Sequence, residues 1–406
     1  MVPKGWSHTT FEKHIDCLTG YAFSSTEYSA EEHDIRLLRG DNIEPGKLRW
    51  INAKRWPRNV QENMDKYFLL EGDFVIALDR TWISGGLKVA EVTCDDLPCL
   101  LVQRVARIRA KKTLAQGLLR QYFSGYKFER YVKLTQTATA VPHISPNDIK
   151  QFSLLLPPIA EQKKIAQILS TWDKAISVTE KLLANSQQQK KALMQQLLTG
   201  KKRLLDENGV RFSGEWCTCT LSEVAHIIMG SSPKSEAYND NGLGLPLIQG
   251  NADIKCRVSC PRVYTSDITK ECTPGDILLS VRAPVGTVAL SQHKACIGRG
   301  ISAIKSKRKM SQSFLYQWFL WFEPKWCYLS QGSTFESINS DDIKTLKLSV
   351  PNFEEQQKIA AVLSAADVEI STLEKKLACL KDEKKALMQQ LLTGKRRVKV
   401  DEAVAA

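Results

Sequence analysis

The chain has 406 residues and a hydrophobic content of 43%, which suits two to four domains with apolar cores. Its net charge of +13 and pI of about 9.1 are consistent with a polyanionic partner, and equally with a basic surface that binds nothing. With eleven cysteines, no signal-peptide pattern and no apolar run near the ~18 residues of a membrane-spanning helix, we expect a cytoplasmic protein with free thiols.

Residues 1–153 are expected to form the first of two mixed α/β globular halves. The apolar run 74–78 follows a Gly72-Asp73 turn and is typical of a strand. If the polyanionic partner is nucleic acid, polar loops that border such strands could contact its bases, because Arg pairs with guanine, and Asn or Gln with adenine. The DNA-binding candidates of this half, each of which could instead be a turn or surface residue, are Arg39, Asp41, Asn42, Arg80, Gln103 and Arg104.

Residues 154–204 are expected to form one long helix. Apolar side chains recur there in alternating three- and four-residue steps, as in a coiled-coil seam, at Ile165, Leu169, Trp172 and Ile176. Pro157 precedes the pattern and Gly200 follows it, which suits a helix start and a helix stop. At 1.5 Å per residue, about 40 residues would give a rod of roughly 60 Å.

Residues 205–347 are expected to form the second α/β half, with a strand after the Gly275-Asp276 turn. Its DNA-binding candidates are Gln249, Asn251, Arg282, Arg299 and Ser333. Asp73 and Asp276 recur between the halves and could suggest a nuclease, but turn formation before a strand is the simpler reading. The aromatic cluster of residues 314–322 could stack on bases, but its helical spacing favours core packing. The basic clusters 201–203 and 305–309 could contact phosphate or lie in solvent.

Residues 348–398 are expected to form a second long helix, followed by a tail at 399–406. The sequence KKALMQQLLTGK occurs unchanged at 190–201 and at 384–395, an offset of 194 (384 − 190), and no gap is needed from Pro157 to Arg203. The second seam is regular except at Lys384. We therefore expect an internal pseudo-twofold repeat whose two helices pair as an antiparallel coiled coil, although an external partner helix could cover the seam instead.

Catalytic and metal-binding signatures are missing from the sequence. It contains no GxxxxGK[ST] phosphate loop, no GxSxG or HExxH motif, and no Asn- or Asp-Pro-Pro-aromatic motif. The tightest cysteine pairs, Cys217 with Cys219 and Cys256 with Cys260, lack zinc-site spacing, so we expect no metal site. These observations favour a binding protein over an enzyme.

The sequence resembles the specificity subunits of type I restriction-modification systems. LPPIAEQKKIA at 156–166, VPNFEEQQKIA at 350–360 and GDILLSVRAPVG at 275–286 carry the resemblance. It covers nearly the whole chain in the order recognition domain, helix, recognition domain, helix. The first half departs from the family pattern, because ALDRTW at 77–82 replaces the Ser-x-Arg-Ala-Pro form.

The resemblance implies two α/β target-recognition domains separated by a pair of long helices. Each domain would read one half of a bipartite site in double-stranded DNA, and the helix pair would set the spacer. Two modification subunits, which bind S-adenosylmethionine and methylate adenine, would dock on the helices. Restriction subunits would then join and use ATP and Mg²⁺. This chain itself would have no catalytic activity and no cofactor.

The near-constant helical segments suggest where the modification subunits dock. The predicted docking residues are Glu161, Gln162, Leu197, Leu198, Glu355, Gln356, Leu391 and Leu392. A coiled-coil scaffold that binds protein and has no DNA specificity remains the alternative function, and an enzyme with an unrecognised site is a third. The missing catalytic motifs argue against the third. Salt-sensitive DNA binding would separate DNA recognition from the scaffold, which predicts no DNA affinity.

Overall fold

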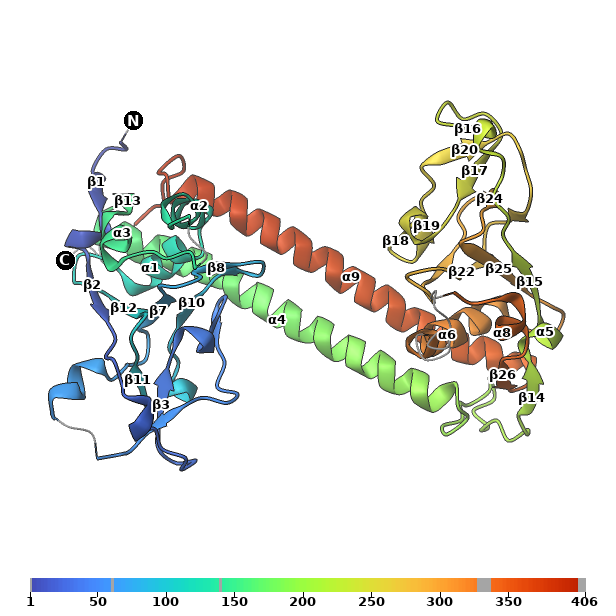
Figure 1. Cartoon of the computed structure of the whole chain (residues 1–406), viewed down its shortest axis with the longest axis horizontal. Helices are drawn as coiled ribbons and strands as arrows, with labels where there is room; N and C mark the ends of the chain where they lie inside the picture. The colour runs from blue at the N-terminus through green and yellow to red at the C-terminus, as the bar shows by residue number, and fades with distance from the viewer. Residues whose placement is uncertain (1, 60–61, 139–140, 327–336, 401–406) are drawn as a thin grey trace. The chain divides into compact units, whose positions relative to one another are not determined.

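The computed structural model describes residues 2–59, 62–138, 141–326 and 337–400. Its internal contacts divide the chain into two units: Met1–Thr179 with Lys376–Ala406, and Glu180–Lys375 (Figure 1). Unit 1 therefore contains one globular domain, the beginning of the first long helix and the end of the second. Unit 2 contains the other domain, the beginning of the second long helix and the end of the first.

The domain of unit 1 is built on two sheets. One is antiparallel, with strand order β10-β7-β12-β2, and the other has the order β11-β3-β6 with β11 parallel to β3. The strands are β1 (Ser7–Thr10), β2 (Ile15–Thr19), β3 (Ile35–Leu38), β4 (Ile43–Glu44), β5 (Lys47–Leu48), β6 (Arg55–Trp56), β7 (Phe74–Ala77), β8 (Trp82–Ile83), β9 (Gly86–Leu87), β10 (Val89–Glu91), β11 (Cys99–Leu101), β12 (Val105–Ala110) and β13 (Ser153–Leu156). The α-helices are α1 (Gln116–Phe123), α2 (Tyr126–Thr135) and α3 (Pro146–Gln151), and the 3-10 helices are Phe11–Lys13, Ser25–Glu27, Gly40–Asn42, Glu62–Tyr67 and Cys94–Asp96.

Strand β7 is buried on both faces, which explains its continuous apolar run. Phe74 and Ile76 pack into the core that includes the helices, whereas Val75 and Ala77 pack into the core shared with the second sheet. Successive side chains of a strand point to opposite faces, so one strand joins the two cores. The antiparallel sheet is therefore the middle layer, between the helices and the smaller sheet.

The domain of unit 2 repeats this plan. Its larger sheet has the order β15-β25-β22-β23-β19-β18 and its second sheet β16-β20-β17-β24-β21, with β17 parallel to β24. The strands are β14 (Cys217–Thr220), β15 (Ala225–Met229), β16 (Tyr238–Asn239), β17 (Leu245–Ile248), β18 (Ile254–Lys255), β19 (Val258–Ser259), β20 (Val263–Thr265), β21 (Glu271–Cys272), β22 (Ile277–Ser280), β23 (Val288–Leu290), β24 (Ala295–Ile297), β25 (Ile301–Ser306) and β26 (Lys347–Val350). The α-helices are α5 (Leu221–Val224), α6 (Gln312–Phe322) and α8 (Ser340–Lys344), and the 3-10 helices are Ser235–Ala237, Asn251–Asp253 and Glu323–Lys325.

The core of unit 2 shows the same two-sided arrangement. Ile277 and Leu279 of β22 pack with the helices, and Leu278 packs with the second sheet. Helix α6 contains the aromatic cluster, and its buried residues include Phe314, Trp318 and Phe319. The prediction that these rings form core is confirmed for this helix.

The long helices are α4 (Ile159–Leu197) and α9 (Phe353–Leu391), each of 39 residues. In unit 1, Asp173 of α4 accepts a hydrogen bond from Lys384 of α9 at 2.5 Å, and Glu161 pairs with Arg397 beyond the end of α9. In unit 2, Lys190 pairs with Asp367, and Arg203 pairs with Glu355. In both units the residue numbers of the first helical segment rise while those of its partners on the second fall. The antiparallel pairing of the two helices is therefore confirmed within each unit.

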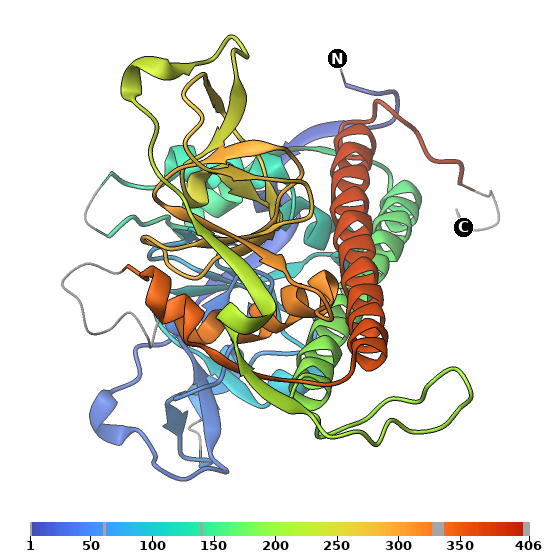
Figure 2. The same ribbon diagram turned by 90° about the vertical axis from the view of Figure 1, so that its right-hand side faces the viewer.

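These ion pairs explain the irregular positions of the seam. Lys384 and its repeat counterpart Lys190 each reach an aspartate of the opposite helix, and both lysine side chains are nearly buried, with 11% and 12% exposure. A charged residue is tolerated in an apolar seam when its charge is paired. Figure 2, which faces unit 2, shows the end of α4 and the start of α9 side by side.

The predicted domain boundaries fall inside two short strands. Residues 154–156 belong to β13, which pairs with β1 through Ser7 and Leu156. Residues 348–350 belong to β26, which pairs with β14 through Cys217 and Val350. These residues extend the globular domains because they hydrogen-bond to the first strand of each domain, and the helices begin only after Pro158 and Asn352.

Candidate nucleic-acid interface

Polar loops of the first domain meet at one edge, where the central strands of both sheets end. We call this edge loop edge 1: Tyr21, Arg39–Asn42, Asp79, Arg80, Gln103, Arg104 and His143. The backbone holds it together, because Val102 N donates to Leu38 O at 3.1 Å and Leu78 N donates to Arg104 O at 2.9 Å. Gln103 N donates to Tyr21 O at 2.8 Å. The structure thus brings all six candidates of this half onto one edge.

Arg39, Asp41, Asp79, Arg104 and His143 of loop edge 1 contact one another through their side chains in two groups. His143 Nδ1 lies 2.6 Å from Asp79 Oδ1, and Arg104 lies 3.6 Å from the same oxygen. Arg39 lies 3.6 Å from Asp41. Burial lowers the pKa of the neighbouring Lys88, while Asp41 acts in the opposite direction. The edge therefore offers donors and acceptors whose orientation is set by their neighbours.

Asn42 is not available to a ligand, which corrects its prediction as a DNA contact. It is 7% exposed. Its Oδ1 accepts from Arg39 N at 3.0 Å and its Nδ2 donates to Arg49 O at 3.0 Å. Both ends of the amide are thus used to close the Gly40–Asn42 turn, which holds Arg39 and Asp41 in place.

The second domain presents an equivalent edge, loop edge 2: Ser231, Gln249, Asn251, Arg282, Arg299 and Ser337. Gln249, Arg282 and Arg299 are exposed and Asn251 is half-buried. Within residues 141–326 and 337–400, no hydrogen bond or ion pair engages the side chains of Arg282 or Arg299. Ser333, the fifth candidate of this half, lies outside the described residues.

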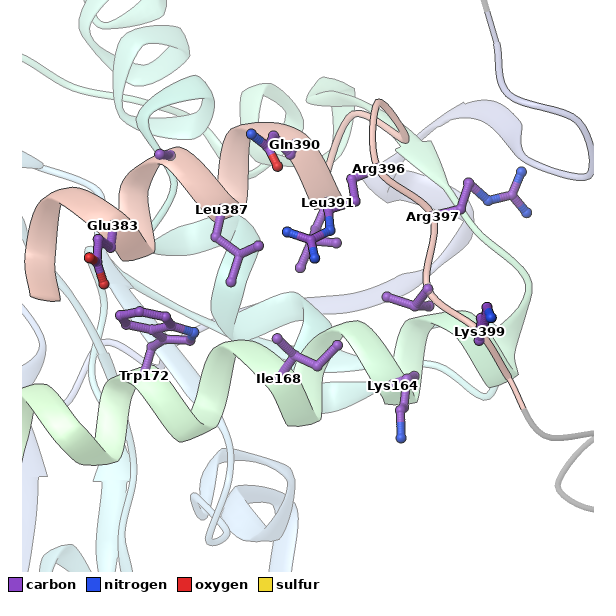
Figure 3. Close-up of a pocket in the computed structure, with 12 residues that line it drawn as sticks. Lys164, Ile168, Trp172, Glu383, Leu387, Gln390, Leu391, Arg396, Arg397 and Lys399 are labelled. Carbon is purple, nitrogen blue, oxygen red and sulfur yellow. The ribbon is translucent and has the colours of Figure 1, made fainter.

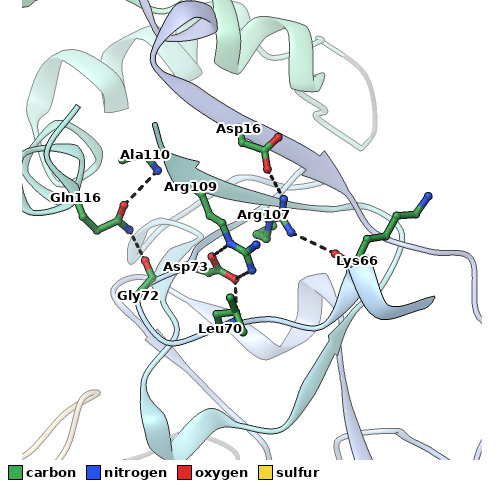
Figure 4. Close-up of polar contacts among 9 residues, drawn as sticks. All are labelled: Asp16, Lys66, Leu70, Gly72, Asp73, Arg107, Arg109, Ala110 and Gln116. Atoms are coloured by element: carbon green, nitrogen blue, oxygen red, sulfur yellow. Dashed lines mark hydrogen bonds and ion pairs between the residues drawn. The ribbon is translucent and has the colours of Figure 1, made fainter. Parts of the chain in front are cut away.

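The aspartates that could have suggested a nuclease lie at the other ends of the central strands, where Asp73 precedes β7 and Asp276 precedes β22. Figure 4 shows the contacts of Asp73. Asp73 Oδ2 accepts from Leu70 N at 2.8 Å, and Asp276 Oδ2 accepts from Thr273 N at 2.7 Å. Asp73 also binds Arg109, and this hydrogen bond raises the pKa of the guanidinium. The two aspartates close turns as expected. Among the described residues no three His, Cys, Asp or Glu side chains gather as metal ligands would.

Each long helix begins at a buried polar junction. Gln162 accepts from Ala115 N at 2.8 Å and donates to Thr113 O at 3.0 Å and Pro157 O at 2.9 Å. Gln356 makes the equivalent bonds to Ser311 N, Lys309 O and Pro351 O at 2.9, 3.3 and 2.9 Å. These amides tie the helix starts to the loops before α1 and α6, and so fix each domain on its helix.

Glutamates next to these amides hold the end of the other helix. Glu355 receives two hydrogen bonds of 2.7 Å from Arg203. Glu161 binds Arg397 and also accepts from Trp6 Nε1 at 3.0 Å. Arg203 is thus engaged in an ion pair, which does not fit the phosphate contact considered for the cluster 201–203.

Burial does not fit direct docking through most of the predicted docking residues. Glu161, Gln162, Leu197, Leu198, Glu355, Gln356 and Leu391 are all at most 9% exposed. Leu392 is partly buried and packs against the core of unit 1. Their identity in the two copies reflects the junctions that they build inside the chain.

A groove of about 790 Å³ opens in unit 1 beside its junction (Figure 3). Trp172 and Ile168 of α4 and Leu387 of α9 form an apolar floor, while Lys164 and Lys399 are among its basic residues. Sequence reasoning missed this surface because it assigned Trp172 to the seam and did not consider the residues after α9.

Sequence reasoning also missed His143 and Ser337, which complete the two loop edges. The backbone of Asp79 forms an antiparallel β-bridge with that of His143, and the backbone of Arg282 forms the same bridge with that of Ser337. The repeat offset of 194 (337 − 143) makes His143 and Ser337 equivalent in sequence, but only the folded backbone brings each of them to its loop edge. None of the described helices is long and apolar enough to cross a bilayer.

Comparison with known proteins shows that the chain belongs to the type I restriction-modification DNA specificity family. The family model described as Type I restriction modification DNA specificity domain matches residues 35–185 and 213–381. A relative in Methanocaldococcus jannaschii, assigned to the type I restriction enzyme MjaX as its specificity subunit, is 34% identical over 378 residues, covering 90% of this chain and 87% of the relative.

Two solved structures also match. One comes from work on complex assembly and conformational transition of the type I R-M system; it has a TM-score of 0.58, 25% identity, and covers 98% of this chain and 100% of that one. The type I restriction-modification S subunit from M. genitalium has a TM-score of 0.64 over 95% of this chain and 96% of its own, and its 14% identity supports the fold alone.

Proposed function

Because this chain belongs to the type I restriction-modification DNA specificity family, we propose that it is the non-catalytic subunit that recognises DNA for such a system. Each domain reads one half of a bipartite target in double-stranded DNA. The net charge of +13 supports contact with phosphate groups.

One observation carries this proposal: the two units share a frame and differ at the loops. Gln162 and Gln356, and Asp173 and Asp367, make equivalent contacts in their own units. The loop edges, in contrast, carry Asp79 in one domain and Arg282 in the other, at equivalent β-bridges. A protein that reads two different half-sites with one scaffold needs this combination.

The long helices suit two further roles in the proposed function. Each has 39 residues and runs from one unit into the other, so their length would set the spacer between the half-sites. Modification subunits would dock near the helices, and the groove of Figure 3 is a candidate surface because its apolar floor is only half-buried and its basic residues Lys164 and Lys399 are exposed.

The remaining partners and cofactors follow from the same proposal. Restriction subunits would join the complex of this chain with two modification subunits. S-adenosylmethionine would bind to the modification subunits, and ATP and Mg²⁺ to the restriction subunits. The complex would work in the cytoplasm.

The proposal is tested by expressing the chain with its modification subunit and sequencing the host genome for methylated adenines. We expect a bipartite motif with a fixed gap, which is absent when this chain is omitted. Methylation without a bipartite motif would instead favour the coiled-coil scaffold. So would a binding assay that finds no affinity for DNA at any salt concentration.

A further inference from the structure

The two loop edges share one backbone. In the first domain, Val102 N donates to Leu38 O at 3.1 Å, and in the second domain Gly298 N donates to Ile248 O at 2.8 Å. Five further hydrogen bonds recur in the same way. In each of them the backbone N–H of the first residue donates to the carbonyl of the second. In the first domain they are 78 to 104, 105 to 102, 20 to 105, 21 to 101 and 144 to 78. Their counterparts in the second domain, in the same order, are 281 to 300, 301 to 298, 230 to 301, 231 to 297 and 338 to 281.

The side chains that project from this shared backbone differ at six equivalent positions of the edge. The pairs, first domain before second, are Tyr21 and Ser231, Arg39 and Gln249, Asp79 and Arg282, Gln103 and Arg299, Arg104 and Gly300, and His143 and Ser337. The buried junctions show the opposite behaviour, because Glu161 and Glu355 are identical. Packing therefore does not explain why the side chains of the two edges differ. A different ligand for each edge would require such differences.

The backbone of loop edge 2 is also held by buried hydrogen bonds and close packing, which a surface that reads bases needs. Ser280 is fully buried, and its hydroxyl donates to the carbonyl groups of Arg282 and Pro284 at 2.9 and 2.6 Å. A Cβ at Gly300 would lie 2.3 Å from the carbonyl oxygen of Gln249, so the two loops touch through their backbones. Arg282, Arg299 and Gln249 are thus held next to one another.

We propose that the loop edges determine base specificity, and that Arg282 and Arg299 of loop edge 2 bind guanines in one half-site. This inference rests on the proposed function. Arginine presents two parallel donors that match guanine O6 and N7 in the major groove. Arg282 and Arg299 are both exposed, and neither forms an ion pair with a carboxylate of the described residues.

Loop edge 1 uses a different device for the other half-site. Asp79 occupies the position of Arg282 and has both His143 Nδ1, at 2.6 Å, and Arg104, at 3.6 Å, beside it. Arg104 is one of the donors of this edge, and Asp79 is a positioning residue that forms an ion pair with its guanidinium. The left-handed backbone at Arg104, with φ of 67°, is rare for a residue other than glycine, and its carbonyl accepts the hydrogen bond from Leu78 N.

The experiment uses the full chain in complex with its modification subunit and compares Arg299→Gln with Arg308→Gln. The two arginines are exposed and lie two residues before and two residues after β25, so they flank opposite ends of a strand about 20 Å long. Methylated-adenine sequencing gives the motif, and binding to duplexes with each base at each motif position gives the discrimination between bases.

We expect Arg299→Gln and Arg282→Gln each to reduce discrimination at one guanine of one half-site by about 5- to 150-fold. The other half-site should be unchanged, which also shows that the variants fold. Arg308→Gln should leave the motif unaltered.

Two results separate failure of this inference from failure of the proposed function. If the wild-type complex has a bipartite motif and both edge variants retain all its base preferences, or if Arg308→Gln changes the motif as they do, the assignment of the edge is wrong. If the wild-type complex has no bipartite motif, the proposed function itself fails.

Discussion

Replacing Arg203 by methionine removes the cation that neutralises a fully buried carboxylate. The Glu355 side chain has 0% exposure, and both of its hydrogen bonds from Arg203 measure 2.7 Å. Removing one partner of a buried ion pair lowers the free energy of unfolding by about 3–5 kcal/mol, because the remaining charge stays buried with neither solvent nor a counter-ion. We therefore expect Arg203→Met to reduce the free energy of unfolding of unit 2 by about that amount.

The equivalent change in unit 1 provides a matched control. Glu161 keeps the hydrogen bond from Trp6 Nε1 at 3.0 Å, and its side chain is 11% exposed. Trp216, the counterpart of Trp6, has no hydrogen-bond partner for its indole nitrogen. Arg397→Met should accordingly cost unit 1 only about 1–3 kcal/mol.

Hydrogen exchange measured by mass spectrometry can follow each unit separately, which a single melting curve cannot do. Peptides that contain β22 report on unit 2, and peptides that contain β7 report on unit 1. Arg203→Met should increase exchange in β22 and leave β7 unchanged, and the double variant Arg203→Met, Glu355→Gln should recover much of the loss. A loss below about 1 kcal/mol, or no recovery in the double variant, would refute this reasoning.

Three further predictions concern other parts of the chain. Asp79→Asn should weaken base discrimination in one half-site only, because Arg104 loses its orienting carboxylate, and methylation mapping that shows both half-sites unchanged would contradict its role. Burial raises the pKa of Cys99 to about 12, so a thiol reagent at pH 8 should label exposed Cys94 quickly and Cys99 only after unfolding, and equal labelling rates in a mass-spectrometric assay would be inconsistent with the structure. Inserting one helical turn at matched positions of α4 and α9 should lengthen the spacer in the methylated motif without changing the half-sites, and an unaltered spacer would exclude the ruler role.

Much of the fold follows from the sequence because the repeat is local and regular. The identical segments and the heptad steps place α4 and α9. The offset of 194 also relates the ion pair of Asp173 with Lys384 to that of Asp367 with Lys190, because 173 + 194 is 367 and 384 − 194 is 190. The ends of the helices were less predictable. Residues 154–156 become strand because β13 pairs with β1, which is far away in sequence, and a helical pattern cannot reveal this pairing.

The candidate site was predictable as a set of loops but not as a set of contacts. Most candidates lie on the loop edges, since polar residues after buried strands gather where strands end. Asn42 was misjudged because its partners, Arg39 N and Arg49 O, are backbone groups of a turn. His143 was missed because only the folded backbone brings it to Asp79, 64 residues earlier.

An exchange of one domain tests the central claim, that two divergent readers sit on one constant frame. Residues 1–156, which keep β1 and β13 together, would be replaced by those of a relative with a different target. The account predicts that methylated-adenine sequencing finds one new half-site, the other half-site intact and the same spacer. A change in both half-sites, or in neither, would contradict it.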